Sequence, residues 1–221
     1  MKAIILPEHG GSELFRVEEV PKPETKPGHV LIQVAASSVN PVDFKIRQGL
    51  IPIGPELPGI LHGDMAGVVE DVGEGVKGFA PGDEVYGCIG GFKGLPGVLA
   101  DYALADAQLL AKKPSNLSME DAAALPLVTI TAWNALMDRA KVSEGQRVLV
   151  HAAAGGVGHV GLQLAKAAGA EVHVTASSDE KITLGEELGA DVGINYKETT
   201  VEEYVAAHAE GSTHEVQEVA L

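Results

Sequence analysis

A glycine-rich turn is the part of this sequence with the clearest chemical meaning. Residues 151–170 read HAAAGGVGHVGLQLAKAAGA, and Gly156, Gly158 and Gly161 have the spacing GxGxxG. Between a strand and a helix, the first glycine permits a tight turn, the second lets the backbone approach a pyrophosphate, and the third lets the helix pack on its strand. The backbone N–H groups of the first helical turn, including that of Val157, attract phosphate. Such turns also occur for packing alone, but the flanking strands and helix favour dinucleotide binding.

The end of the following strand indicates which dinucleotide. An acidic residue about 20 positions after the glycines is typical of NAD, whereas a cation suits the extra phosphate of NADP. Here Ser177 and Ser178 offer hydroxyl groups and Lys181 follows one turn later, so NADP is favoured. Two alternatives stay open: Asp179 as a ribose ligand, and a capping box of Ser177 and Glu180 that leaves Lys181 solvated.

The elements that must position these residues change in character along the chain. Up to about residue 120, apolar and polar residues alternate between glycine and proline turns, which predicts short antiparallel strands of a barrel-like domain at 29–37, 64–73 and 82–90. Later, β-branched runs alternate with helical stretches, a βαβαβ order with strands at 147–151, 171–177 and 192–196. The fold class is therefore α/β, and we predict two domains, residues 1–122 and 123–221.

Composition excludes several classes of protein. The formal net charge of −15 and the lack of a basic run disfavour nucleic acid as a partner. The sequence has no apolar run long enough for a membrane span and no secretory signal, and its single cysteine, Cys88, fits a reducing compartment. We expect a soluble, cytoplasmic protein with a small-molecule substrate.

Five motifs together resemble one known family. They are NPVDFKIRQG, LHGDMAGVVEDVGEGVKGFAPGDEVYG, LPLVTITAWNAL, the glycine turn itself and LGADVGINY. In this order they resemble the quinone oxidoreductase, or zeta-crystallin-like, branch of the medium-chain dehydrogenases/reductases. The resemblance implies a GroES-like β-barrel domain followed by a Rossmann doubly wound parallel sheet, with NADPH in the cleft and a quinone, enone or carbonyl substrate. It further implies that Thr131 reaches the nicotinamide, and that Ser177, Lys181 and Tyr196 face the 2′-phosphate.

Zinc is the main alternative chemistry, because related alcohol dehydrogenases bind it through cysteine and histidine. At the corresponding places this sequence has Asn40, the tripeptide HGD and about Leu127. His62 has no thiolate partner, and the four-cysteine structural lobe of those enzymes is absent from a sequence with one cysteine. We therefore expect no metal.

Without zinc, hydrogen bonds must stabilise the charge that develops on the substrate oxygen. Asn40 is the candidate donor, and Asp43 and Arg47 are candidates for orienting the loop or relaying a proton. The alternative is an Asn-Pro turn in which Asp43 pairs with Arg47. Asp64 receives no firm role.

The end of the chain departs from the family pattern. Residues 209–221 read AEGSTHEVQEVAL, a polar stretch without the expected apolar strand and glycine. We therefore expect a C-terminally truncated member with only the first mononucleotide half of the Rossmann sheet, in which nothing fills one side of the strand at 147–151. An exposed edge of this kind invites self-association, so a homo-oligomer is expected. Two functions stay open: an NADPH-dependent reductase, or a non-catalytic NADP-binding remnant that needs a partner or is inactive.

Overall fold

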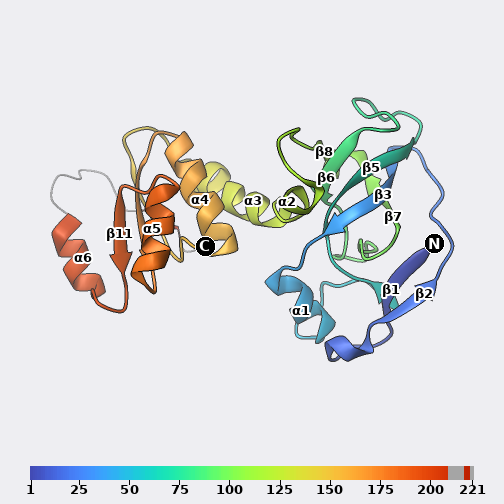
Figure 1. Ribbon diagram of the computed structural model, residues 1–221, viewed down its shortest axis with the longest axis horizontal. Coiled ribbons are helices and arrows are strands. Elements are labelled where there is room, and N and C mark those ends of the chain that lie inside the picture. Colours follow the sequence, from blue (N-terminus) through green and yellow to red (C-terminus); the bar gives the residue numbers. More distant parts are fainter. Residues whose placement is uncertain (209–216, 220–221) are drawn as a thin grey trace. The chain divides into compact units, whose positions relative to one another are not determined.

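The chain divides into two compact units, Met1–Leu127 and Val128–Leu221. The structure is a computed structural model that describes residues 1–208 and 217–219 (Figure 1). Helix α2 (Met119–Ala123) belongs to the first unit, because Ala122 and Ala123 are buried against Ala66. The structural division therefore falls after this helix, whereas the sequence-based boundary after residue 122 falls inside it.

The first unit is built from two antiparallel sheets. The larger has the strand order β7-β3-β5-β6-β8 and the smaller has the order β2-β1-β4. The strands are β1 (Lys2–Leu6), β2 (Arg16–Glu19), β3 (His29–Ser37), β4 (Gly59–Ile60), β5 (Asp64–Val72), β6 (Glu84–Cys88), β7 (Tyr102–Asp106) and β8 (Ala111–Lys112). The helices are α1 (Pro41–Arg47), α2 and the short 3₁₀ turns η1 (Ser12–Leu14) and η2 (Ala107–Leu109). The predicted strands at 29–37, 64–73 and 82–90 are confirmed as β3, β5 and β6.

The larger sheet is held by the alternation that predicted it. Val30 and Ile32 of β3 are fully buried and pack with Met65 and Val69 of β5 and Val85 of β6. Side chains at every second position of a strand point to the same face, so the apolar residues form one continuous core surface. The same packing holds in place the first residue of β5, Asp64.

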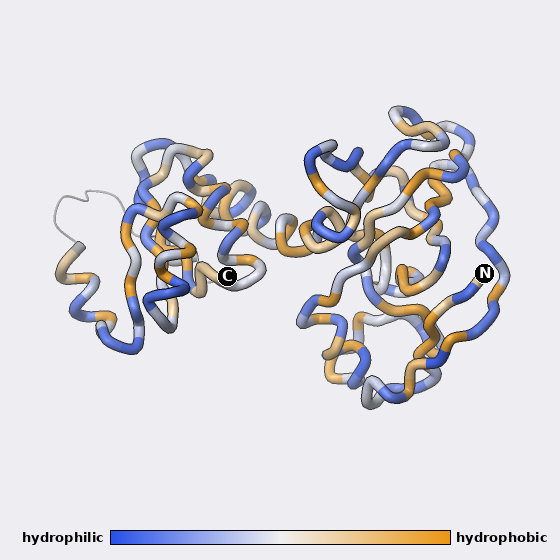
Figure 2. The backbone as a smooth tube through the Cα atoms, in the orientation of Figure 1, coloured by the Kyte–Doolittle hydropathy of each residue, from blue (hydrophilic) through white to orange (hydrophobic). Residues whose placement is uncertain are grey.

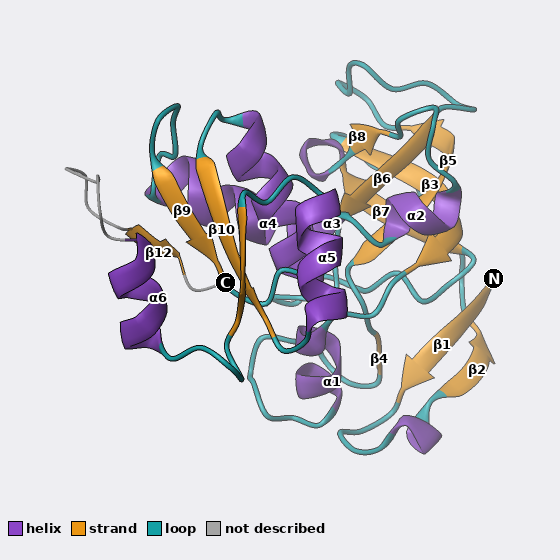
Figure 3. Cartoon of the chain, turned by 60° about the vertical axis from the view of Figure 1, so that its left-hand side comes forward, coloured by secondary structure: helices purple, strands orange, loops and turns teal. Residues whose placement is uncertain are grey.

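The second unit contains a four-stranded parallel sheet with the order β11-β10-β9-β12. Figure 3 shows β9 and β10 side by side. The strands are β9 (Arg147–Val150), β10 (Glu171–Ala176), β11 (Val192–Asn195) and β12 (Gln217–Val219), and the helices are α4 (Gly156–Ala167), α5 (Asp179–Glu187), α6 (Val201–His208) and the π-helical η3 (Asn134–Arg139). Helix α3 (Pro126–Trp133) begins at the end of the first unit. The predicted βαβαβ order is confirmed.

One expectation about this sheet is wrong. The sequence predicts that nothing fills the open side of β9, yet β12 pairs there in parallel, with Gln217 opposite Val148 and Val219 opposite Val150. The strand escapes prediction because it is three residues long and lies among glutamates, so it has no apolar run or clear alternation.

Hydrophobic residues are distributed over both units (Figure 2). Among the residues that the structure describes, no helix has the length and apolar character required to cross a bilayer.

Asp191, just before β11, joins two elements of the second unit. Its carboxylate accepts hydrogen bonds from Lys166 Nζ at 2.8 and 2.9 Å and from the Val172 backbone N–H at 2.7 Å. The hydrogen bonds from Lys166 and Val172 lower the pKa of Asp191 below its ordinary value of 3.8. The folded state therefore gains stability that is present above this ordinary value and is lost as the pH falls through the lower folded-state pKa.

We expect Asp191→Asn to lower the free energy of unfolding at pH 7 by about 1 kcal/mol, a modest loss because the ion pair is solvent-exposed. The difference from the unsubstituted chain should shrink as the pH falls below about 4. Urea unfolding at pH 7 and pH 3 measures both effects. Glu187→Gln, at an exposed position of α5, serves as the control. A loss of equal size at both pH values would contradict the assigned role of the charge.

Candidate functional site

The predicted dinucleotide turn connects β9 to α4. Gly155 is the N-cap of α4 in an extended conformation, and the left-handed backbone of the turn lies at Ala152, with φ of 52°. A Cβ atom added to Gly158 would lie 2.3 Å from the carbonyl oxygen of Ala152. A Cβ atom on Gly156 would meet only Val128 Cγ1, at 3.2 Å. Gly158 is therefore required by the close packing of the turn itself.

The first turn of α4 offers a site for an anion. An α-helix leaves its first N–H groups without a partner inside the helix, and Gly155 has no side chain with which to cap them. The N–H groups of Gly156, Val157 and Gly158 lie at this positive end of the helix dipole. Gly161, further along α4, is buried, as its predicted packing role requires.

The carboxyl ends of β10 and β11 bring together the residues predicted to bind the 2′-phosphate. The Tyr196 backbone N–H donates to the carbonyl oxygen of Ala176 at 3.1 Å. Since Ala176 directly precedes Ser177, this bond places the Tyr196 backbone beside Ser177. Lys181 Nζ lies 3.4 Å from Ser177 Oγ. Lys181 is exposed and the Tyr196 side chain is 54% exposed. A cation, a hydroxyl group and an aromatic ring are thus available at one edge of the sheet.

The two alternatives for this segment fare differently. The capping box of Ser177 and Glu180 is wrong, because the N-cap of α5 is Ser178, whose side chain makes no capping hydrogen bond. Asp179 Oδ1 accepts a hydrogen bond from Asn195 Nδ2 at 3.1 Å. This bond ties Asp179 to the end of β11.

A cavity of about 500 Å³ lies at the same edge of the sheet. His151, at the end of β9, lies 3.0 Å from Thr175 Oγ1 through its Nδ1 atom. Tyr196, Glu202 and Tyr204 also line the cavity. The sequence alone does not indicate this contact, since nothing in the local pattern around His151 marks a neighbour on another strand.

In the first unit, Asn40 and Asp43 form the start of α1. Asn40 is the N-cap, and Asp43 Oδ2 accepts its backbone N–H at 2.7 Å. Both residues are buried, with exposed fractions of 7% and 2%. The alternative pairing of Asp43 with Arg47 is wrong, because Arg47 Nη1 donates to the carbonyl oxygen of Gly10 at 2.8 Å.

Asp64 is the residue that sequence reasoning missed. Its side chain is completely buried, and its Oδ2 atom accepts a hydrogen bond from Asn40 Nδ2 at 2.9 Å. The backbone N–H of Leu127 donates to both carboxylate oxygens, at 3.1 and 3.2 Å. The signal in the sequence was a carboxylate at the first position of an apolar strand.

Burial is the largest cause of the pKa shifts of the titratable residues around Asn40. It raises the pKa of Asp64 and of Asp43, lowers the pKa of His62 and raises the pKa of the Cys88 thiol. The Nδ1 atom of His62 is buried without a hydrogen-bond partner, and its ring packs edge-on against Phe15. Across residues 1–208 and 217–219, no three His, Cys, Asp or Glu side chains are arranged to hold a metal ion.

Comparison with known proteins shows the family to which this chain belongs. The profile of the alcohol dehydrogenase GroES-like domain matches residues 26–115, and that of the zinc-binding dehydrogenase family matches residues 156–219. The chain is 44% identical to an alcohol dehydrogenase superfamily protein from Novosphingobium aromaticivorans, with a TM-score of 0.89 over 95% of this chain and 62% of that one. The chain belongs to the medium-chain dehydrogenase/reductase family. The predicted family and fold class are confirmed.

Two further relatives have informative names. The chain is 40% identical to the NADPH-dependent alkenal/one oxidoreductase of Arabidopsis thaliana chloroplasts, over 92% of this chain and 54% of that protein. It is 31% identical to Escherichia coli quinone oxidoreductase, crystallised with NADPH, with a TM-score of 0.78 over 96% of this chain and 63% of that one. The chain thus spans between about half and two thirds of the length of these relatives.

The predicted residues of this family member fall into two groups. The second unit brings Ser177, Lys181 and Tyr196 to the carboxyl edge of its sheet. Strand β10, which leads to Ser177, is the neighbour of β9, which leads to the glycine turn. The first unit brings Asn40 and Asp43 together. Of the other predicted residues, Arg47 donates to the carbonyl oxygen of Gly10, and Thr131 is exposed on α3.

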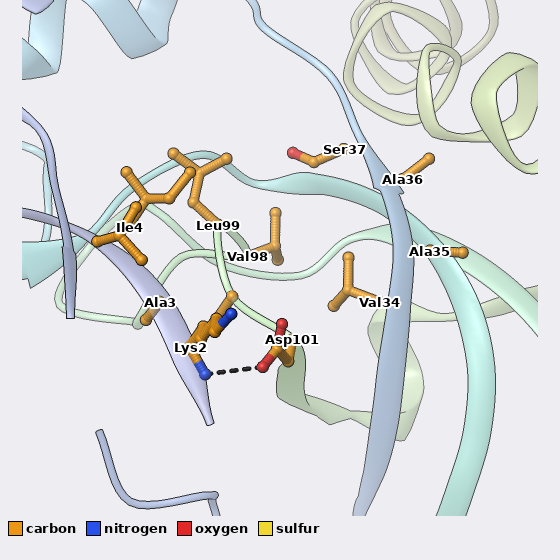
Figure 4. Close-up of a pocket in the computed structure, with 12 residues that line it drawn as sticks. Lys2, Ala3, Ile4, Val34, Ala35, Ala36, Ser37, Val98, Leu99 and Asp101 are labelled. Atoms are coloured by element: carbon orange, nitrogen blue, oxygen red, sulfur yellow. Dashed lines mark hydrogen bonds between the residues drawn. The ribbon is translucent and has the colours of Figure 1, made fainter. Parts of the chain in front are cut away.

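A cavity of about 270 Å³ in the first unit offers little chemistry (Figure 4). It lies between β1 and β3, and its lining is mostly aliphatic. Its acidic side chain, Asp101, already accepts the backbone N–H of Lys2 at 2.7 Å. In the first unit, the candidate site is therefore the group formed by Asn40, Asp43 and Asp64 and not this cavity.

We expect Asp43→Ala to lower the free energy of unfolding by about 2 kcal/mol, because the buried N–H of Asn40 loses its acceptor. Thermal or urea unfolding measures the loss. Lys45→Ala, at an exposed position of the same helix, is the matched control and should change stability little. Similar losses in the two variants would show that Asp43 acts through general helix stability and not through its hydrogen bond.

Proposed function

We propose that this chain binds NADP(H) and takes part in hydride transfer from NADPH to a quinone, an enone or a related carbonyl compound. The observation that carries the proposal is the combination of the β9–α4 turn with Ser177, Lys181 and Tyr196 at one edge of the sheet. The turn suits a pyrophosphate, since the first N–H groups of α4 have no partner within the helix and the N-cap, Gly155, has no side chain with which to cap them. Lys181 and the hydroxyl groups suit a 2′-phosphate.

The proposed role of Asn40 follows from the two N–H donors of its amide. One of them is bonded to Asp64, so the other can donate to the oxygen of a substrate. NADPH, when bound, supplies the hydride to the electrophilic carbon, and negative charge then develops on that oxygen. A fixed amide donor stabilises this charge without titrating, and water supplies the proton that completes the reduction.

The direct test separates binding from turnover. We expect NADPH to bind in a fluorescence titration and its absorbance at 340 nm to fall when 1,4-benzoquinone or an enone is added. Binding without oxidation would favour the second candidate, a dinucleotide-binding protein without catalysis. Absence of NADPH binding would refute both.

We further propose that catalysis needs no zinc. The support lies in the residues: Asn40 is an amide, and Asp64 already accepts hydrogen bonds from Asn40 and Leu127. We expect activity to survive dialysis against EDTA, and elemental analysis to find no stoichiometric zinc. Zinc at one equivalent, with activity lost on its removal and restored on its return, would overturn this proposal.

The remaining proposals concern the cellular location, the class of substrate and the oligomeric state of the protein. The charge of −15 and the single cysteine support a cytoplasmic location and a small-molecule substrate over a nucleic acid. Self-association stays a proposal that sedimentation analysis tests directly, although β12 fills the side of β9 that suggested it.

A further inference from the structure

The Asp64 carboxylate connects segments of the first unit that are distant in the sequence. It accepts a hydrogen bond from Asn40, 24 positions away, and from the backbone of Leu127, 63 positions away. Asn40 begins α1, and Leu127 lies in the first turn of α3. Ser38 Oγ also donates to Asp64, at 3.4 Å. One buried side chain thus fixes the candidate donor and the start of a helix to the same point.

The chemistry of this group restricts the orientation of Asn40. An ionised carboxylate has no proton to donate, so each group that faces it must be a donor. Rotation of the Asn40 amide by half a turn would place its carbonyl oxygen against Asp64 Oδ2, where two acceptors would repel each other. The amide nitrogen must therefore face Asp64, and this contact determines the direction of the second N–H.

The surroundings of Asp64 make this contact costly to lose. The side chain is fully buried, so an unsatisfied polar atom here has no water to replace its partner. Burial raises the pKa of Asp64, whereas the hydrogen bonds from Asn40 and Leu127 lower it. The donors therefore favour the ionised form that accepts their hydrogen bonds.

We propose that Asp64 is a positioning residue for the reduction: it holds the Asn40 amide with its free N–H toward the substrate oxygen, and anchors the first turn of α3 to that amide. The inference rests on the proposed function, in which Asn40 donates to the substrate. Asp64 acts through Asn40, since its own oxygens are occupied by donors of the protein.

The test compares two variants with a control. Asp64→Asn places an NH₂ group among donors. The double variant Asn40→Asp/Asp64→Asn exchanges the two partners, so that Asn at 64 donates to the new carboxylate at 40 and still accepts from Leu127. Asp101→Asn is the matched control, because the Asp101 carboxylate also accepts a backbone N–H, that of Lys2, but at an exposed position.

We expect Asp64→Asn to lower kcat/KM for an enone about 100-fold, mainly through kcat, without a change in NADPH affinity. It should also lower the melting temperature and speed hydrogen exchange at the Leu127 amide. The double variant should recover the melting temperature and the slow exchange, but not kcat/KM, because it presents a carboxylate where the substrate needs a donor. Asp101→Asn should leave kcat/KM unchanged.

Two results would overturn the inference. One is an unchanged kcat/KM in Asp64→Asn, and the other is recovery of kcat/KM together with stability in the double variant, which would leave Asp64 with a structural role alone. If the unsubstituted chain oxidises no NADPH with either substrate, the proposed reduction fails instead. Hydrogen exchange then tests the anchoring of α3 separately: faster exchange at Leu127 in Asp64→Asn supports this anchoring, and unchanged exchange refutes it.

Discussion

Gly158→Ala is expected to destabilise the second unit by about 3 kcal/mol and to abolish most NADPH binding. The added Cβ atom would lie 2.3 Å from the carbonyl oxygen and 2.9 Å from the carbonyl carbon of Ala152, both of which are backbone atoms. Backbone atoms in a tight turn cannot move aside as the end of a side chain can. The turn must open, and the N–H groups of α4 must shift from the positions that suit a pyrophosphate.

Gly156→Ala is the matched control for this prediction. Its Cβ atom would meet only the Cγ1 atom of Val128, at 3.2 Å, and that side chain can adjust. Since alanine favours a helix over glycine by roughly 1 kcal/mol, the net change in stability should be small. Urea unfolding and an NADPH titration of both variants measure the contrast. Equal stability of the two variants would show that the backbone contact at Ala152 is not what requires a glycine.

Lys181→Ala is expected to weaken NADPH binding by about 10- to 150-fold, equivalent to the loss of roughly 1.5–3 kcal/mol from one charge-assisted contact. NADH binding should barely change, because NADH lacks the 2′-phosphate. Lys181 is exposed, and its Nζ atom lies 3.4 Å from Ser177 Oγ, a neutral hydroxyl group. The ammonium group is therefore available to a phosphate.

Lys197→Ala distinguishes a specific contact from the general effect of charge. Lys197 is also exposed and follows Tyr196 directly, so its loss changes the net charge equally. We expect it to reduce NADPH affinity far less than Lys181→Ala, and raised salt to narrow the difference. Equal losses of NADH and NADPH binding in Lys181→Ala would mean that this lysine acts through the fold and not through the phosphate.

Local patterns in the sequence predicted the strands and turns whose formation depends on residues close in the sequence. The alternation in β3 and β5 and the glycine turn before α4 were sufficient, because each depends on neighbours in the chain. The contacts of Asp64 were not predictable in this way, since its partners lie 24 and 63 positions away and come together only in the folded sheet. Strand β12 was missed for another reason: it is three residues long and has no apolar run or clear alternation.

The antiparallel pairing of the first unit has a consequence for synthesis of the chain. Strand β3 pairs with β7, so that His29 lies opposite Asp106, and Ala3 of β1 bridges to Ala100. A ribosome releases the N-terminal strands long before these partners, and pairings distant in sequence form slowly. Until β7 emerges, β3 has an apolar strand edge without its final neighbour. We expect aggregation to compete with folding at this stage, and the nascent chain to depend most on chaperones there.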